Sequence, residues 1–286
     1  MLGVIGGTGL YDLPGLDDVE TVDVDTPFGA PSAALVRGTL NGLPVVFLAR
    51  HGHGHRINPS EIPFQANIYA MKQVGVTHLL SVNAVGSLRE DLPPRTAVVP
   101  HQIIDRTVSR PRTFFENGIV AHVGMADPFC NSFRARIVDA ARGAQDAVHD
   151  GGTYICIEGP QFSTRAESHL FRQWGADIIG MTAMPEARLA REAGLCYGSL
   201  AMVTDFDVWH ESEDDVTIEI VTRVLAANIE TSRNVIRSIS DSGLPDCDNG
   251  CATAAASSLT THDDHIAPEV RERLAVILKS RQDAQG

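Results

Sequence analysis

The stretch Cys196-Tyr-Gly-Ser-Leu-Ala-Met-Val-Thr-Asp-Phe-Asp207 decides how the rest of the chain is interpreted. Its apolar run 200–203 predicts a short buried strand. Asp205 and Asp207 follow at alternate positions, so on an extended chain both carboxylates would point to one side. Open α/β sheets usually bind ligands at the carboxyl ends of their strands. The two aspartates are therefore a candidate catalytic pair, with a solvated turn as the alternative.

Segments on both sides of this stretch alternate between strand and helix patterns. Strands are expected at 33–36, 44–48, 78–82, 97–100 and 153–157, the first two joined by a hairpin turn at Asn41-Gly42. Helices are expected at 60–74, 132–144, 164–174, between Pro185 and Gly194, at 216–239 and, after a polar exposed loop at 241–258, at 268–280. This alternation predicts an α/β three-layer sandwich, with a central mixed, mostly parallel twisted sheet flanked by helices. We expect a single domain over 1–286, with a core at 1–240 and a loop and C-terminal helix at 241–286.

The charge of the chain excludes some classes of partner. Its 36 acidic and 23 basic residues give a formal net charge of -13, whereas nucleic acid binding needs clustered cations. No apolar stretch reaches membrane-spanning length, and the chain begins with a strand-like segment in place of a signal peptide. We therefore expect a cytoplasmic protein that binds neither nucleic acid nor membrane.

The five cysteines leave several possibilities open. Cys130, Cys156 and Cys196 lie in apolar sequence and are most simply buried thiols. Cys247 and Cys251 lie in the polar segment Cys-Asp-Asn-Gly-Cys and could form a small disulfide, bind a metal with other ligands, or do neither. Because the sequence offers no second cysteine pair, metal is the least expected of the three.

Two loops near the amino terminus are candidate anion sites. Gly6-Gly-Thr-Gly9 follows a short strand, but Leu13-Pro14-Gly15 excludes the helix that a dinucleotide-binding turn must open. An anion-binding loop and a plain tight turn remain. Arg50-His-Gly-His-Gly-His55 has histidines at alternate positions, as in a metal site, yet its glycines argue against a regular strand. The planar guanidinium of Arg50 suits an oxyanion better.

Seven motifs occur in a fixed order along the chain. They are Gly6-Gly-Thr-Gly9, Thr26-Pro-Phe-Gly29, Ala49-Arg-His-Gly52, Asn83-Ala-Val-Gly-Ser87, Glu158-Gly-Pro-Gln-Phe162, Gly180-Met-Thr-Ala-Met-Pro-Glu186 and Thr204-Asp-Phe-Asp207. In this order they resemble the trimeric purine nucleoside phosphorylases, and more closely the members that act on S-methyl-5'-thioadenosine. The cysteine-bearing tail resembles that of archaeal members. The resemblance implies phosphorolysis, in which phosphate attacks the anomeric carbon of a nucleoside and the purine leaves.

The resemblance also implies roles for individual residues. Those expected to bind phosphate are Thr8, Arg50, His51, Asn83, Ala84 and Thr182, several of them through backbone N–H groups. Those expected to contact the nucleoside are Phe162 and Ser163 at the base, Met181 at the ribose, and Ile218, Val221 and His55 at the 5' end, with His122 from a neighbouring subunit. Asp205 would lie at purine N7 and Asp207 at the 6-amino group. The resemblance implies no cofactor, and a trimer or a dimer of trimers.

Base choice is expected to depend on the two aspartates. Neighbouring carboxyls cannot both ionise cheaply, so one should stay protonated, and we assign the general acid to Asp205. In the 6-oxopurine members of the family, Asn replaces Asp205 and Glu replaces Ser163. A carboxylate accepts from a 6-amino group but opposes a 6-oxo group, at a cost on the order of 1–3 kcal/mol. Adenine-type bases should therefore be preferred, with methylthio only weakly favoured over hydroxyl at the 5' end.

Departures from the family pattern and competing functions remain. Asn83 stands where Thr or Ser is common, and the spacing of Cys247 and Cys251 is wider than the Cys-x-Cys of archaeal relatives. The nearest alternative is a 6-oxopurine phosphorylase acting on inosine, guanosine or methylthioinosine. A nucleosidase that uses water would not need Arg50 and Thr182. A non-catalytic nucleotide- or metal-binding module would use the glycine loop or the histidines.

Overall fold

The computed structural model describes residues 1–7, 9–10, 13–210 and 217–278. Its sheet is built around two ten-residue strands that pair in parallel, β5 (His78–Ser87) and β11 (Cys196–Asp205). Every residue of β11 is buried, because the strand lies inside the sheet and helices pack on both of its faces. The strand predicted at 200–203 is therefore confirmed as the middle of a longer one.

Nine further strands extend this sheet in the described part of the chain. To one side of β5 lie β1 (Leu2–Gly6), β4 (Leu43–Ala49), β3 (Leu35–Leu40) and β2 (Leu16–Val22); beyond its carboxyl end lie β10 (Ile178–Gly180), β9 (Thr153–Ile157) and β7 (Gln102–Arg106). Next to β11 lies β6 (Ala97–Val99), and β8 (Val148–Asp150) pairs with β6. The antiparallel pairs are β2–β3, β3–β4, β5–β10 and β6–β11, and the others are parallel. The predicted mixed, mostly parallel sheet is confirmed.

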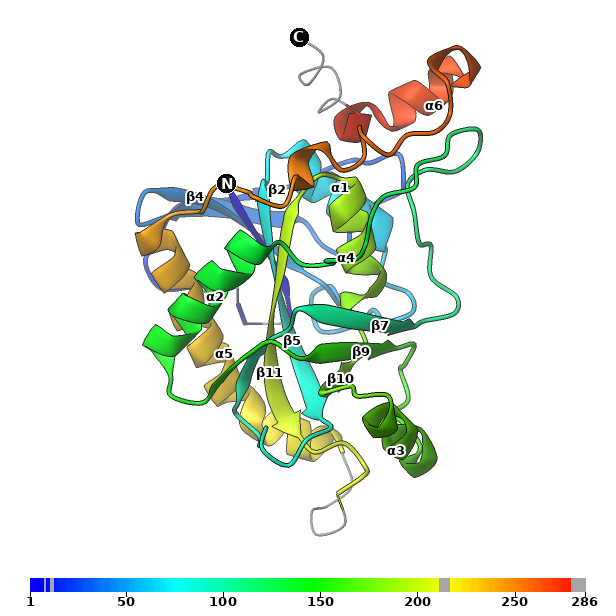
Figure 1. The fold of residues 1–286 in the computed structure, drawn as a ribbon. Helices are drawn as coiled ribbons and strands as arrows, with labels where there is room; N and C mark the ends of the chain where they lie inside the picture. Colours follow the sequence, from blue (N-terminus) through cyan, green and yellow to red (C-terminus); the bar gives the residue numbers. More distant parts are fainter. Residues whose placement is uncertain (8, 11–12, 211–216, 279–286) are drawn as a thin grey trace.

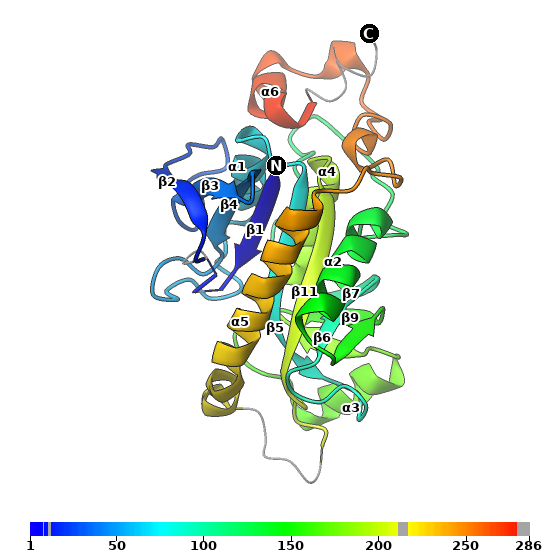
Figure 2. The ribbon, with the colours of Figure 1, turned by 90° about the vertical axis from the view of Figure 1, so that its left-hand side faces the viewer.

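Helices form a layer on each side of β5 and β11 (Figure 1). On one side, α2 (Asn131–Ala144) and α5 (Ile218–Ser242) pack against each other and against β11. On the other side, α1 (Phe64–Gln73) packs against α4 (Ala183–Glu192), which contacts both strands. Figure 2 shows α5 and α2 side by side in front of the sheet. The three-layer α/β sandwich is thus confirmed.

The alternation of side chains along β5 and β11 divides their apolar residues between two hydrophobic clusters, one on each face of the sheet. Leu80 and Leu200 pack toward Phe133 of α2, whereas Leu79 and its cross-strand partner Tyr197 pack toward α1 and α4. Strand positions on both faces are apolar, as expected for strands that are covered on both sides.

Three predicted segments differ from the observed ones. The helix expected at 60–74 begins only at Phe64, because Asn58 forms a turn with Ser60 and Glu61 just before it. The helix expected at 268–280 is interrupted: α6 (Pro268–Arg273) is followed by a turn at Leu274 and helical residues at 275–278, and positions 279 and 280 lie outside the described residues. The loop expected to be exposed at 241–258 is exposed only in part: Cys251 is 1% exposed and begins a short 3-10 helix.

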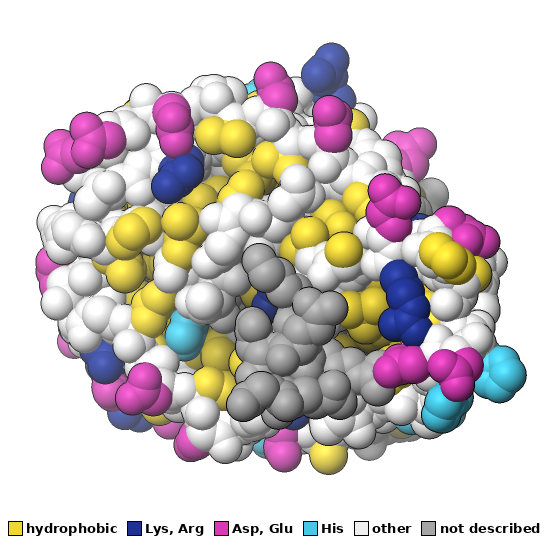
Figure 3. Space-filling model, turned by 90° about the horizontal axis from the view of Figure 1, so that it is seen from above, with side chains coloured by type: hydrophobic (Ala, Val, Ile, Leu, Met, Phe, Trp, Pro, Cys, Tyr) yellow, Lys and Arg dark blue, Asp and Glu magenta, His cyan; other side chains and the backbone are white. Residues whose placement is uncertain are grey.

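The two ends of the molecule carry different elements. Helix α3 (Arg165–Gln173) lies at one end, and the predicted capping box of Thr164 and Glu167 opens it. Helix α6 lies at the other end, where patches of hydrophobic side chains lie among acidic ones (Figure 3). None of the described helices is both long and apolar enough to span a bilayer.

Candidate active site

A cavity of about 720 Å³ opens where β1, β4, β5 and β11 end, and the amino-terminal half of α5 forms one of its walls. This is the edge of the sheet at which open α/β folds bind ligands, and its size suits a small organic molecule. The predicted site residues that line it are Arg50, His51, His55, Asn83, Ala84, Phe162, Ser163, Met181, Thr182, Asp205, Asp207, Ile218 and Val221. Thr8 lies outside the described residues, and His122 is exposed on a loop away from this cavity.

Asp205 and Asp207 come together through a turn. The pairing of β11 with β5 shifts register between Val203 and Asp205, and Asp207 has a left-handed backbone, with φ of 54°. The backbone N–H of Asp207 donates to Oδ1 of Asp205 over 2.8 Å. Alternation along an extended strand was therefore the wrong reason for their proximity. A Cβ atom at Gly86 would lie 2.9 Å from the same Oδ1, so glycine leaves room for this carboxyl.

Both carboxyls favour the protonated form more than an exposed aspartate does. Burial raises the pKa of Asp205, and burial, with the nearby charge of Asp205, raises the pKa of Asp207 to about 6. Oδ2 of Asp207 is buried and has no hydrogen-bond partner among the described residues. Thr204 Oγ1 lies 2.7 Å from Asp205 Oδ2 and 3.2 Å from the carbonyl of Val85. When Asp205 is protonated, its carboxyl can donate to Thr204 Oγ1, and the Thr204 hydroxyl can then donate to the carbonyl of Val85.

Asp207→Asn should change the pH dependence of stability. The folded pKa of about 6 lies above the ordinary value of 3.8, so ionisation costs folding free energy as pH rises from about 4 to about 6, and this cost persists at higher pH. Asparagine cannot ionise. Relative to wild type, the variant should therefore gain about 2 kcal/mol in free energy of unfolding between pH 4 and pH 8. Urea unfolding at both pH values measures this, with the exposed Asp127→Asn as control; an unchanged difference between variant and wild type would contradict it.

Arg50 is held by a protein carboxylate. Its Nε and Nη2 donate to the two carboxylate oxygens of Glu186 over 3.0 and 3.2 Å, and both side chains are buried. Nη2 also lies within hydrogen-bond distance of Ser81 Oγ and the carbonyl of Ile5, and Nη1 donates to the carbonyl of Val82. The Nε and Nη2 edge of the guanidinium is thus paired with Glu186, whereas we had expected it to face a bound anion. The second N–H of Nη1 is left to reach one, and phosphate binding by Arg50 stays a prediction.

His51 is a neutral acceptor facing the cavity. Its Nδ1 lies 2.8 Å from the carbonyl of Ile57, which can only accept, so Nδ1 carries the proton. Burial, with the charge of Arg50, lowers the pKa of His51 to about 4, so the ring is neutral at higher pH and Nε2 is an acceptor. A monoprotonated phosphate could donate to it. The ring stacks on His55 at a centroid distance of 4.2 Å, within turns that replace a regular strand.

Asn83 positions Thr182. Thr182 Oγ1 donates to Asn83 Oδ1 over 2.7 Å, and Asn83 Nδ2 donates to Ser199 Oγ over 2.9 Å. The hydroxyl proton of Thr182 is therefore used inside the protein. Its backbone N–H, which precedes the kink at Met184 and the regular turns of α4, is left as the group that could donate to an anion.

Sequence reasoning missed several residues that shape the cavity. Glu186 belongs to a quoted motif, but nothing in the sequence indicated that it pairs with Arg50 and accepts from Tyr197 Oη over 3.0 Å. Arg110 was missed entirely: it donates to the carbonyls of Met181 and Met184 and so fixes the chain where α4 begins.

Helical spacing could have revealed two more cavity residues. Thr222 and Leu225 follow Ile218 and Val221 on the same face of α5, and all four line the cavity. The apolar wall is therefore longer than predicted.

Comparison with known proteins identifies the family. The model of the phosphorylase superfamily matches residues 1–241. The chain belongs to this superfamily. Among phosphorylases, S-methyl-5'-thioadenosine phosphorylase of Geobacter sulfurreducens is 49% identical over 98% of both chains, and that of Chloroflexus aurantiacus is 52% identical over 96% of both.

Solved phosphorylase structures share the fold. A methylthioadenosine phosphorylase sourced from an antarctic soil metagenomic library is 47% identical, with a TM-score of 0.92 over 97% of this chain and 98% of that one. Methylthioadenosine phosphorylase from Schistosoma mansoni in complex with adenine is 36% identical, with a TM-score of 0.81 over 99% of both chains. The family expected from the seven motifs is therefore confirmed.

Proposed function

We propose that this phosphorylase converts S-methyl-5'-thioadenosine and phosphate to adenine and 5-methylthioribose 1-phosphate, a step of purine and methionine salvage. One observation carries the proposal: a single cavity combines donors and acceptors suited to an anion, two buried carboxyls with raised pKa, and an apolar helix wall. The names and high coverage of the relatives support the same reaction.

The reaction divides among three parts of the cavity. A phosphate oxygen forms a bond to C1' while the bond from C1' to N9 breaks, and the purine takes a proton at N7. His51, the Thr182 backbone N–H and Nη1 of Arg50 would hold the phosphate on one face of the ribose. Asp205 would protonate N7, and Asp207 would accept from the 6-amino group. Together they stabilise the charge that develops as the bond breaks.

The base and the 5' group have apolar contacts available. Phe162 is 44% exposed beside the cavity, so its ring is free to stack on a purine. At the 5' end, Ile218, Val221 and Leu225 present aliphatic side chains that suit a methylthio group. Adenosine should react more slowly, because its 5' hydroxyl would lie against the same apolar wall.

The test is the release of free base from methylthioadenosine, adenosine and inosine, each with and without phosphate. We expect phosphate-dependent release of adenine, fastest from methylthioadenosine. Release without phosphate would indicate a nucleosidase, and faster release from inosine would indicate a 6-oxopurine phosphorylase. We propose that phosphate is the second substrate and that no organic cofactor takes part.

We also propose that the active protein is a homotrimer or a dimer of trimers. His122 and the partly apolar loop around it are exposed, and Val120 is 46% exposed, so this surface is available to a neighbouring subunit. If His122 completes the neighbour's 5' pocket, a closed ring is required. Light scattering coupled to size exclusion should give three or six chains, and an active monomer would refute the proposal. His122→Ala should raise the KM for methylthioadenosine without changing the KM for phosphate.

A further inference from the structure

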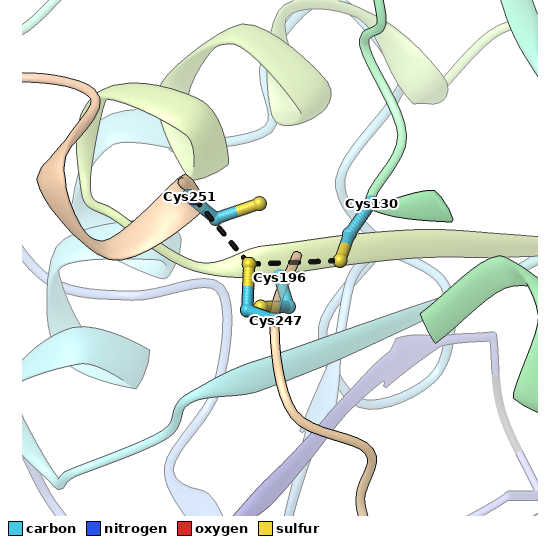
Figure 4. A group of neighbouring side chains, drawn as sticks. All are labelled: Cys130, Cys196, Cys247 and Cys251. Atoms are coloured by element: carbon cyan, nitrogen blue, oxygen red, sulfur yellow. Dashed lines mark hydrogen bonds between the residues drawn. The ribbon is translucent and has the colours of Figure 1, made fainter. Parts of the chain in front are cut away.

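Four of the five cysteines gather at the end of β11 that lies away from the aspartates (Figure 4). Cys196 begins β11, Cys130 precedes α2, and Cys247 and Cys251 follow α5. All four sulfur atoms lie within 4.8 Å of one another. This corrects the expectation that Cys247 and Cys251 lack a second pair, because Cys130 and Cys196 supply it.

The spacing of the sulfur atoms fits a tetrahedral metal site. With zinc–sulfur bonds of about 2.3 Å, the sulfurs of a tetrahedral site lie about 3.8 Å apart. Cys130 Sγ and Cys247 Sγ are 4.0 Å apart, whereas a disulfide would need about 2.05 Å. Cys247 and Cys251 are separated by three residues, within the range typical of paired zinc ligands.

Donors around the cluster suit thiolates. The backbone N–H of Cys251 donates to Cys247 Sγ over 3.4 Å, and Nη1 of Arg191 donates to Cys251 Sγ over 3.1 Å. Gly250 has a left-handed φ of 59°, which turns the chain so that this N–H points back at the sulfur. Such outer contacts orient metal ligands and offset the negative charge of four thiolates.

The same surroundings hold the loop against the protein. Asn249 Oδ1 accepts from the backbone N–H of Asn131, and the carbonyl of Asn249 accepts from Arg191. The loop that carries two of the cysteines is thus fixed to α2 and α4 by contacts that do not involve sulfur. The cluster is therefore a built arrangement, in which three of the four cysteines are buried.

We propose that Cys130, Cys196, Cys247 and Cys251 bind one Zn²⁺ as a structural site. Four thiolates complete a tetrahedral shell and leave no open position, so the site would stabilise and not catalyse. It would tie the segment after α5 to the amino end of β11, nine residues and roughly 30 Å along the strand from Asp205.

Metal content tests the proposal. The untagged protein, purified under reducing conditions without added metal, should contain about one zinc ion per chain when measured by inductively coupled plasma mass spectrometry. Cys247→Ser should lower this at least tenfold, because it removes one ligand at the most exposed position of the cluster. Cys156→Ser is the matched control, since Cys156 is a buried cysteine outside the cluster, and it should retain zinc.

Other outcomes overturn the proposal. Five reactive thiols without metal would leave only a thiol cluster. A chain lighter by the hydrogens lost on oxidation, with fewer reactive thiols, would show that the same cysteines form disulfides. Bound iron in place of zinc would confirm a metal site at these cysteines but would refute the assignment of zinc. Cobalt substitution gives a second readout that needs no variant, because a tetrahedral tetrathiolate site should show a strong thiolate-to-cobalt charge-transfer band.

Discussion

Asp205→Asn should lower kcat/KM for methylthioadenosine by roughly 10²–10⁴, the span typical of losing a general acid. Asparagine keeps the size of the side chain and can still face N7, but it cannot deliver a proton there. It also faces the base with an amide in place of two carboxyl oxygens. Inosine should lose much less or even gain, because the 6-oxopurine members of the family carry Asn at this position. Initial rates on both nucleosides at saturating phosphate measure the effect.

Two comparisons make this experiment decisive. The KM for methylthioadenosine should change little, since Phe162 and the apolar wall are untouched. Asp207→Asn serves as the matched variant, because the pKa of Asp207 is also raised. A larger loss in kcat for Asp207→Asn than for Asp205→Asn would move the general acid to Asp207. Equal proportional losses on adenine- and hypoxanthine-type substrates would make Asp205 a structural turn residue.

Arg50→Ala should have the second largest effect, on both stability and phosphate binding. It leaves the buried carboxylate of Glu186 without its cation, which costs on the order of 3–5 kcal/mol in free energy of unfolding. It also removes the N–H that we expect to reach the phosphate, so the apparent KM for phosphate should rise far more than the KM for the nucleoside. Urea unfolding and initial rates measure the two effects.

A double variant separates these effects. Arg50→Met with Glu186→Gln removes both charges of the buried pair, so most of the lost stability should return. If Arg50 contacts phosphate, the KM for phosphate should stay high in the double variant. Recovery of that KM together with stability would limit Arg50 to a structural role. An equal rise of both KM values would remove it from the anion site.

Local patterns predicted the fold where packing follows the sequence directly. Three features were predicted because each is encoded by residues only a few positions apart: the hairpin at Asn41-Gly42, the capping box at Thr164 and the buried β11. The short strands β8 and β10 were missed, and so was β2, whose mostly exposed residues give no apolar pattern. The mixed pairing depends on which strands meet, which neighbouring residues do not determine.

The sequence predicted which residues form the candidate site better than it predicted the contacts among them. The motif order named nearly all the residues of the cavity, yet not the buried pairing of Arg50 with Glu186, which is 136 positions away. The cysteine cluster was missed for the same reason. Its members come from segments far apart in the chain, and spacing along a sequence says nothing about such contacts.

The first turns of helix α5 are packed much less tightly than its carboxyl-terminal half. Its carboxyl-terminal half buries Val235, Ile236 and Ile239 completely, while in its amino-terminal half Ile218 and Leu225 remain 65% and 36% exposed along the cavity. Substrate would therefore supply the packing that this half lacks, coupling binding to local helix stability. Backbone amides near Leu225 should exchange with deuterium more slowly once a methylthio nucleoside is bound, while those near Ile236 stay unchanged. Preference for the alkylthio group would then be a property of the stability of the helix as much as of the shape of the pocket.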